Sequence, residues 1–183
     1  MHGTSTALVI LVPEAEDRFG AFRRAHDSAA RNGSLAHITL LYPFLRERDL
    51  QDTAKEKLDA LFRQHAAFSF SLTKMARFRG VLYLAPEPAA PFITLTQAIW
   101  AQFPDHPPYG GRFSRITPHL QLAQDDDEAA LDRWEAGFLA QHGPDLPQHC
   151  HATAVHLIDE RLGRWHIRWA FPLGASPNPG ASA

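Results

Sequence analysis

The sequence predicts an α+β fold built from antiparallel strands and helices. The first observation behind this prediction is that strand-length and helix-length patterns alternate along the 183 residues. The second is that several neighbouring strands are separated only by short turns, and such connections join antiparallel strands. The third is an internal similarity, because a histidine-containing strand followed by a helix and a hairpin occurs near residue 37 and again near residue 119. We therefore expect two related halves that pack together and bury a shared core.

The first part of the chain contains two expected strands and two expected helices. Residues 7–12 are a continuous aliphatic run that ends at Pro13, which is typical of a buried strand. Residues 14–32 repeat apolar side chains at helical spacing and end at an Asn-Gly-Ser turn. Residues 35–42 alternate polar and apolar side chains, so we expect a strand with one buried face. Residues 49–66 combine an apolar stripe with a charged pair at helical spacing and give the clearest helix.

The same strand and helix periodicities predict the elements in the rest of the chain. Two proline-rich stretches, 86–91 and 104–112, are expected to connect the elements on either side of them. We expect residues 1–173 to form one domain, and 174–183 to be a disordered tail because Gly, Ala, Ser and Pro dominate it. The expected strands are 68–73, 81–85, 117–124, 152–159 and 165–171, and the expected helices are 92–103 and 125–141.

The composition is that of a soluble protein with an ordinary core: 45% of the residues are hydrophobic, 21% are charged, and the formal net charge is −2. All apolar runs are far shorter than the roughly 20 residues of a membrane-spanning helix, and the N-terminus lacks a secretory signal pattern. We therefore expect a cytoplasmic protein with no membrane partner. The one cysteine excludes an intramolecular disulfide and a multi-cysteine zinc module. A net charge near zero gives the protein no overall electrostatic attraction to nucleic acid, although it is compatible with a small basic site inside a cleft.

Two of the eleven histidines recur in the same local setting. His37 shares one strand face with Thr39, and His119 shares another with Gln121. If a twofold axis relates the halves, the two imidazoles face each other across a groove, where one can accept a proton and the other can protonate a leaving oxygen of a phosphodiester without a metal. The Thr39 hydroxyl and the Gln121 amide would then donate hydrogen bonds to the phosphate oxygens. From spacing alone, both histidines are equally well explained as ordinary strand residues bonded to their neighbours.

Arginines and aromatic residues near the expected groove are further candidates for substrate binding. An arginine there could bind a phosphate through two hydrogen bonds. Alternatively, it could be an ordinary solvated surface residue. An aromatic ring at the rim of the groove could stack on a nucleobase. Alternatively, the aromatic residue could belong to the hydrophobic core. A glycine pair at 110–111 shapes either a loop over the substrate or a simple turn. The candidates are Arg77, Arg79 and Arg115 for phosphate, and Tyr42, Tyr83 and Phe44 for a base.

A second group of histidines raises the question of a metal. His149, Cys150 and His151 are consecutive, and His156 follows. On a strand, His149 and His151 share one face while Cys150 and His156 point to the other, which divides the set, so we expect no metal site here. Cys150 has no evident partner that would make it a nucleophile. Because the chain is rich in histidine, a metal-dependent hydrolase remains a hypothesis. This hypothesis predicts that activity is lost in a strong chelator.

Three segments together resemble the 2'-5' RNA ligase-like branch of the 2H phosphoesterase superfamily: 37–44 (HITLLYPF), 81–84 (VLYL) and 118–123 (PHLQLA). The resemblance runs from about residue 7 to residue 173 and includes the last hairpin. It implies a bilobal fold in which a pseudo-twofold pair of antiparallel sheets, flanked by helices, encloses a central active-site groove without metal or cofactor. His37 and Thr39 match the first His-x-Thr/Ser tetrad of that branch, and His119 matches the second. Gln121 departs from it, since the branch has threonine or serine there.

The resemblance implies a phosphoesterase that acts on a 2',3'-cyclic phosphate or a 2'-5' phosphodiester. We expect the partner to be a nucleotide or RNA end, with no cofactor and no obligate protein partner, and we expect the chain to be a monomer. The departure at Gln121 supports an alternative, a catalytically impaired nucleotide- or RNA-binding module that keeps the groove. Glutamine is longer than threonine, and a small displacement of the phosphate is costly in catalysis. Binding without turnover at saturating substrate would identify this alternative.

Overall fold

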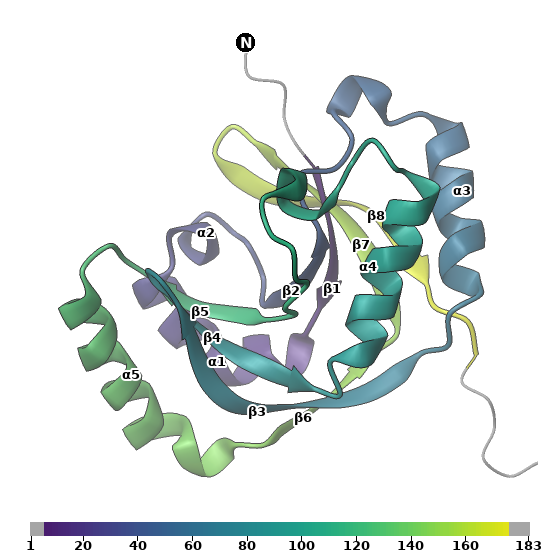
Figure 1. Cartoon of the computed structure of the whole chain (residues 1–183). Coiled ribbons are helices and arrows are strands. Elements are labelled where there is room, and N and C mark those ends of the chain that lie inside the picture. Colours follow the sequence, from purple (N-terminus) through teal and green to yellow (C-terminus); the bar gives the residue numbers. More distant parts are fainter. Residues whose placement is uncertain (1–5, 176–183) are drawn as a thin grey trace, which may run out of the picture.

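The computed structural model describes residues 6–175 and has an α+β fold, as the sequence predicts (Figure 1). Eight strands form one curled antiparallel sheet in the order β6-β3-β4-β5-β2-β1-β7-β8. The strands are β1 (Thr6–Leu11), β2 (His37–Leu41), β3 (Phe68–Phe78), β4 (Val81–Glu87), β5 (Leu120–Gln124), β6 (Gln148–Ala152), β7 (Ala154–Arg161) and β8 (Arg164–Pro172). The helices are α1 (Pro13–His26), α2 (Ser28–Arg31), α3 (Asp52–Arg63), α4 (Ala90–Gln102) and α5 (Glu128–His142), with short 3₁₀ turns η1 (Glu47–Asp49), η2 (Pro108–Gly111) and η3 (Gly143–Asp145).

The two halves of the sheet meet at a narrow seam between β2 and β5. Strands β6, β3, β4 and β5 lie on one side of it, and β2, β1, β7 and β8 lie on the other. Across the seam the strands are in register at one residue pair, Ile38 with Leu120. The strands predicted to form a pair of sheets therefore form a single sheet, and the two-lobe description stays a prediction. The seam places the strand that begins with His37 next to the strand that follows His119.

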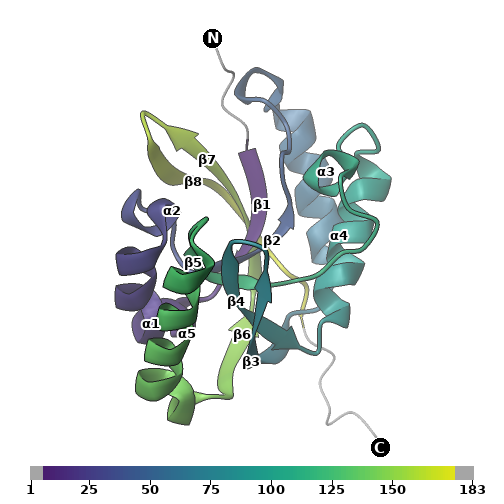
Figure 2. The same ribbon diagram turned by 60° about the vertical axis from the view of Figure 1, so that its left-hand side comes forward.

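The helices cover the sheet in two groups, and Figure 2 shows α1, α2 and α5 on one side with α3 and α4 on the other. Helix α1 follows β1 in the chain but packs on β5 and β6, while α4 follows β4 but packs on β2. Helix α5 packs on β4 and β5, and α3 packs on β8. Each half of the sheet is therefore covered partly by a helix from the other half. As a result, one hydrophobic cluster extends across the seam.

Alternation along β2 and β5 places polar side chains on one face of the sheet, as predicted. In β2, His37 and Thr39 are partly exposed, while the residue between them and the two that follow are buried. In β5, Gln121 is partly exposed between the buried side chains of Leu120 and Leu122. Because the two strands are antiparallel neighbours, the polar side chains of both face the same space.

The first helix is shorter than the sequence predicts, because a cap interrupts it. Asp27 leaves the helical conformation (φ −132°, ψ 119°), and its carboxylate accepts a hydrogen bond from the Ala29 N–H at 2.9 Å. Helix α1 therefore ends at His26, and α2 is a separate single turn. Apolar spacing continues through this break, so periodicity alone predicted one helix.

Other boundaries also differ from the prediction. Strand β6, which was not predicted as a separate strand, pairs with β3 at the edge of the sheet, and the strand expected from residue 117 begins at Leu120. Gly174, the first residue of the expected tail, forms a bridge with Ala66, and residues 176–183 lie outside the described part of the chain. Within residues 6–175, no helix is long and apolar enough to cross a membrane.

Candidate functional site

His37 and His119 line one cavity of about 310 Å³ above the seam, which we call the central cavity. Thr39 and Gln121 also line it, and so does Tyr42, which follows β2. These five candidates from sequence come together because the short register between β2 and β5 brings the two polar strand faces side by side. Their catalytic and binding roles stay predictions, but their common location is a property of the fold.

The two histidine rings are held in the same way. The Nδ1 atom of His37 lies 2.7 Å from the carbonyl oxygen of Leu35, and the Nδ1 atom of His119 lies 2.9 Å from the carbonyl oxygen of Thr117. A carbonyl oxygen can only accept a hydrogen bond, so this geometry assigns the neutral ring's proton to Nδ1 in both residues. The Nε2 atom of each ring is then left as the atom that can accept or deliver a proton.

Burial favours the neutral form of both histidines. The pKa of His37 is lowered to about 4, chiefly by burial; the bond to the Leu35 carbonyl opposes this shift, and the positive charges of Arg23 and of a protonated His119 contribute to it. Burial likewise lowers the pKa of His119 from its ordinary value of 6.5, and the bond to Thr117 opposes this. Near pH 7 the free protein therefore presents two neutral imidazoles to the central cavity.

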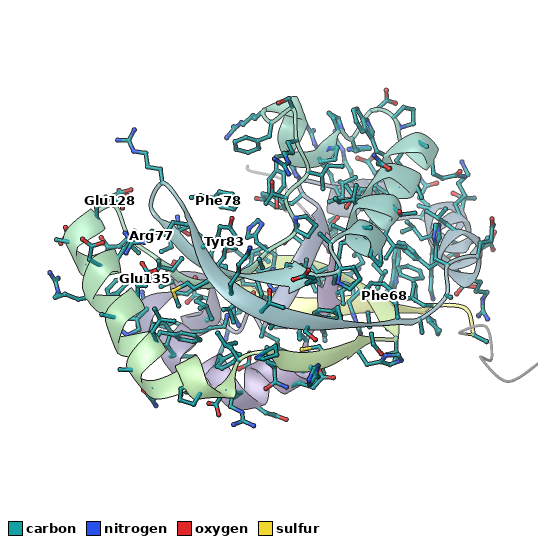
Figure 3. All side chains as sticks on the ribbon, turned by 60° about the horizontal axis from the view of Figure 1, so that its bottom comes forward. Phe68, Arg77, Phe78, Tyr83, Glu128 and Glu135 are labelled. Carbon is teal, nitrogen blue, oxygen red and sulfur yellow. The ribbon has the colours of Figure 1, made fainter. Side chains whose placement is uncertain are left out.

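Aromatic rings support His119 from the side. The ring of Tyr83 lies edge-on to it at 5.4 Å between centroids, and the ring of Phe78 does so at 5.0 Å. Phe78 and Tyr83 stack on each other at 4.4 Å, and Figure 3 shows them side by side. Tyr83 is 7% exposed, so the structure places it beneath His119 and not at the rim where sequence analysis expected it. Phe44 is also buried, against Phe103 in the core.

Two of the predicted arginines lie beside the central cavity. Arg79 and Arg115 line a second cavity of about 480 Å³, the arginine cavity, together with Phe78, Phe113 and His119. Since His119 lines both cavities, the two arginines lie on the His119 side of the site. Their guanidinium groups make this side electropositive, which suits a phosphate-bearing ligand.

Arg77 points away from the site and is held by carboxylates of α5. Its Nε donates to Glu135 at 2.8 Å, and its Nη atoms lie 2.8 Å from Asp132 and 3.6 Å from Glu128. Figure 3 shows Arg77 between Glu128 and Glu135. Three acidic neighbours leave this guanidinium little capacity for a phosphate, so the phosphate role considered for Arg77 is not supported.

Tyr109 is a site residue that sequence analysis missed. It lines both the central cavity and the arginine cavity, and its N–H donates to the carbonyl oxygen of Tyr42 at 2.7 Å. Tyr109, Gly110 and Gly111 all have positive φ angles (52°, 63° and 74°). The glycine pair therefore belongs to a loop that borders the site, and it was the signal in the sequence that could have identified Tyr109.

Arg23 of α1 is the second residue that sequence analysis missed. Its side chain is 2% exposed. Its Nε donates to the backbone carbonyl of Gln121 at 2.9 Å, and its Nη1 donates to the carbonyl of Ser34 at 3.1 Å. Glu16 and Asp27 accept further bonds at 3.2 and 3.4 Å. Two carboxylates balance the buried charge, and one guanidinium bridges the seam.

The histidines of β6 are divided in the way the sequence indicated. His149 and His151 are exposed and contact Ser71 and Ser69 across the strand pair, whereas Cys150 is buried and His156 belongs to β7. No group of three or more His, Cys, Asp or Glu side chains within residues 6–175 is arranged to hold a metal ion. Burial, with the nearby Glu14 carboxylate, raises the pKa of Cys150 to about 12, which makes its thiol a poor nucleophile.

Comparison with known proteins adds a family and a fold. The family model described as the 2'-5' RNA ligase superfamily matches residues 11–164. A crystal structure of E. coli LigT complexed with 3'-AMP is similar, with 18% identity, coverage of 94% of this chain and 99% of LigT, and a TM-score of 0.59. TT0787 of Thermus thermophilus has 16% identity, coverage of 94% and 100%, and a TM-score of 0.60. A structure described only as a phosphoesterase has 20% identity, coverage of 93% and 99%, and a TM-score of 0.59. No curated protein sequence matches the chain.

Proposed function

The chain belongs to the 2'-5' RNA ligase superfamily, and from this premise we propose that it is a phosphoesterase that cleaves a 2',3'-cyclic phosphate or a 2'-5' phosphodiester at a nucleotide or RNA end. One observation carries the proposal. Two imidazoles, each with Nδ1 bound to a backbone carbonyl and Nε2 left over, line one cavity, one at the start of β2 and the other directly before the neighbouring strand β5. A pair of this kind can remove one proton and deliver another in a single displacement at phosphorus.

For hydrolysis of a cyclic phosphate we assign the base to His37 and the acid to His119. A pKa of about 4 keeps His37 unprotonated, so its Nε2 can take a proton from the attacking water. The negative charge of a bound phosphate raises the pKa of a nearby imidazole, so His119 can hold a proton on Nε2 in the complex. The water oxygen forms a bond to phosphorus, the bond to the 2'- or 3'-oxygen breaks, and His119 protonates that oxygen.

Thr39 and Gln121 supply hydrogen-bond donors for the two non-bridging oxygens. The Thr39 hydroxyl and the Gln121 amide line the central cavity on opposite sides of the seam. One amide hydrogen of Gln121 is directed to Gln124 at 3.3 Å, and the amide has a second hydrogen for the phosphate. Donors placed where negative charge develops stabilise the transition state. The longer glutamine side chain replaces the shorter hydroxyl of the resembled motif in this role.

The side of the site next to His119 suits the nucleotide that carries the cyclic phosphate. Arg79 and Arg115 provide positive charge there, and Phe113 and Tyr109 provide aromatic surface. Tyr42 is 40% exposed and offers a further ring at the edge of the central cavity. Structures of E. coli LigT are described as complexes with 3'-AMP, ATP and phosphate, which supports a nucleotide as the ligand of this chain.

The first test of the proposal is hydrolysis of 2',3'-cyclic AMP in excess EDTA. We expect turnover that is unchanged by EDTA, because the proposed proton transfers need only the two imidazoles. Release of adenosine monophosphate is measured by chromatography before and after chelation. Loss of activity in EDTA that returns with zinc would instead support the metal-dependent hydrolase. Saturable binding of the cyclic nucleotide without turnover would support the binding module.

The pH dependence of kcat/KM tests the assignment of acid and base, because this quantity reports the free enzyme. His37 acts unprotonated, so activity falls as the pH decreases through about 4. His119 acts protonated and its pKa lies below 6.5, so activity falls as the pH rises through that lower value. We therefore expect a bell-shaped profile with an optimum between about 4 and 6.5. An optimum above about pH 7 would contradict the assignment.

A further inference from the structure

The backbone is supported differently at the two catalytic candidates. His37 is the first residue of β2 and lies in register with Leu11 of β1. His119 lies outside the strands, at the end of the irregular segment 112–119 that precedes β5. Its Nδ1 contact joins it to Thr117 of that same segment. Since the side-chain torsion next to a histidine ring is broad, the His119 imidazole needs further support from another element to keep one orientation.

Phe78 and Tyr83 of the β3–β4 hairpin supply this support. Phe78 lies opposite Val81 and Tyr83 lies opposite Ala76, so the two aromatic side chains are diagonal neighbours on one face of the strand pair. Their rings stack on each other, and both rings also contact His119. The three rings therefore pack as one unit, and the imidazole cannot rotate unless the aromatic pair moves with it.

The other face of the hairpin is fastened to α5 by Arg77. Arg77 and Phe78 are consecutive in β3, so their side chains point to opposite faces of the strand. The carboxylates around the guanidinium are spaced by four and three residues and share one face of α5. They belong to Glu128, Asp132 and Glu135. The hairpin turn is held there too, since the Gly80 N–H donates to Glu128 at 3.2 Å. The place of the Phe78 ring is thus set from α5.

We propose that Arg77 and Phe78 are positioning residues for the proposed reaction. Arg77 holds the β3–β4 hairpin on α5, and Phe78, stacked on Tyr83, holds the His119 imidazole so that its Nε2 faces the leaving oxygen of the cyclic phosphate. This inference rests on the proposed function and adds to it two residues that do not touch the reacting atoms. A displacement of about 1 Å at a catalytic group costs about 100-fold in rate, so the loss of such support is measurable.

The kinetic test compares two phenylalanines of β3 with 2',3'-cyclic AMP as substrate. Phe78→Leu removes the ring beside His119, and Phe78→Tyr keeps it. Phe68→Leu is the matched control, because Phe68 lies at the other end of β3, packs on Phe92 and lines neither the central cavity nor the arginine cavity (Figure 3). We expect Phe78→Leu to lower kcat by about 10- to 100-fold and to change KM less than about twofold. Phe78→Tyr should restore kcat, and Phe68→Leu should keep it.

The division between kcat and KM separates positioning from substrate binding. Phe78 also lines the arginine cavity, so direct contact with the nucleotide is the competing explanation for its effect. Direct contact predicts that Phe78→Leu raises KM and leaves kcat nearly unchanged, and this result would overturn the inference.

The state of the His119 ring is measured by NMR without any substrate. At about pH 8 the imidazole is neutral, and proton–nitrogen correlation spectra show which ring nitrogen carries the hydrogen. In the wild type we expect this hydrogen on Nδ1, where the Thr117 carbonyl accepts it. In Phe78→Leu the ring rotates, so the spectrum should move toward an average of the two tautomers. Phe68→Leu and Phe78→Tyr should keep the wild-type pattern. An unchanged pattern in Phe78→Leu would overturn the inference whatever the kinetics.

Arg77→Met tests the fastening of the hairpin. We expect it to lower kcat by about three- to tenfold, with a change of the His119 spectrum in the same direction as in Phe78→Leu. Arg133→Met is its control, because Arg133 also makes an ion pair at α5, with Asp127 at 3.9 Å, and it should keep wild-type kcat. The double variant Arg77→Met, Phe78→Leu should have the kcat of Phe78→Leu alone, since both changes act through one ring. Additive losses would remove Arg77 from the inference.

The outcomes distinguish this inference from the proposed function and from a general loss of stability. If the wild-type protein does not turn over 2',3'-cyclic AMP, the proposed function fails, and the NMR comparison alone decides whether Phe78 positions His119. If Phe78→Leu and Phe68→Leu lower kcat equally, or if Phe78→Tyr does not restore it, the positioning role is overturned. If Phe78→Leu does not fold, the partly exposed Arg77 gives the same two measurements in Arg77→Met, and a wild-type kcat and spectrum there overturn the inference.

Discussion

Replacement of either His37 or His119 by alanine is expected to lower kcat for 2',3'-cyclic AMP by about 100- to 10,000-fold, the range for loss of a general acid or base. Each imidazole supplies one proton transfer that the other cannot replace in the same displacement. Water and the remaining donors of the central cavity would leave a low residual rate. Initial rates measured at saturating substrate, with folding checked by circular dichroism, give the result.

The control for this prediction is His149→Ala, which removes an exposed histidine of β6 that contacts Ser71 of β3, away from the central cavity. It should keep wild-type activity. The double variant His37→Ala, His119→Ala should lose little more than either single variant, because residues that act as one unit are not additive. A single variant that keeps more than about a tenth of the wild-type kcat would exclude that histidine as acid or base.

Replacement of Arg23 by methionine is expected to reduce both stability and kcat. The change leaves Glu16 and Asp27 without their cation, and it leaves the carbonyl groups of Gln121 and Ser34 without their donor. Removing one partner of a buried ion pair typically costs about 3–5 kcal/mol of unfolding free energy. Arg23 donates to the Gln121 carbonyl of β5 and to the Ser34 carbonyl three residues before His37, so we expect its loss to change the separation of the two histidines. Urea unfolding and steady-state kinetics measure the two effects.

Arg23→Lys separates the charge of this residue from its geometry. Lysine keeps the positive charge but lacks the planar fork that reaches two carbonyls and two carboxylates at once. We expect it to recover part of the stability and little of kcat. The pH profile gives a second signature: the Arg23 charge lowers the pKa of His37, so Arg23→Met moves the acid limb of kcat/KM to higher pH, whereas Arg23→Lys leaves it in place.

Arg24→Met is the matched control for the Arg23 variants. Arg24 is the next residue of α1, its side chain is 55% exposed, and it also pairs with Glu16, at 2.7 Å. An exposed ion pair contributes little to stability, so this variant should change neither the unfolding free energy nor kcat by more than a small amount. If Arg24→Met and Arg23→Met had similar effects on kcat, Arg23 would have no special part in positioning the histidines.

The strands that carry the candidate site were predictable because their pattern is local. Period-two alternation around Ile38 and around Leu120 already places His37 with Thr39, and His119 with Gln121, on the polar face of each strand. Aromatic and charged residues were less predictable. Tyr83 lies within β4 and is buried under His119, whereas Tyr42 follows β2 and is exposed at the central cavity. The difference depends on what packs against each ring.

The sequence by itself determined the α+β class, the polar faces of the two histidine strands and the resemblance to a phosphoesterase family, because these depend on residues close together in the chain. Only the tertiary structure decided that one seam joins the two strands, that Arg23 is buried across it, and that Arg77 is held by α5. Gln121, to which Arg23 donates, lies 98 residues away in the chain, and Glu135, to which Arg77 donates, lies 58 residues away, so no local pattern can contain these two bonds. A cavity of about 270 Å³ likewise joins residues of the turn before β2 to residues of β8, and it exists only when the last hairpin packs beside His37.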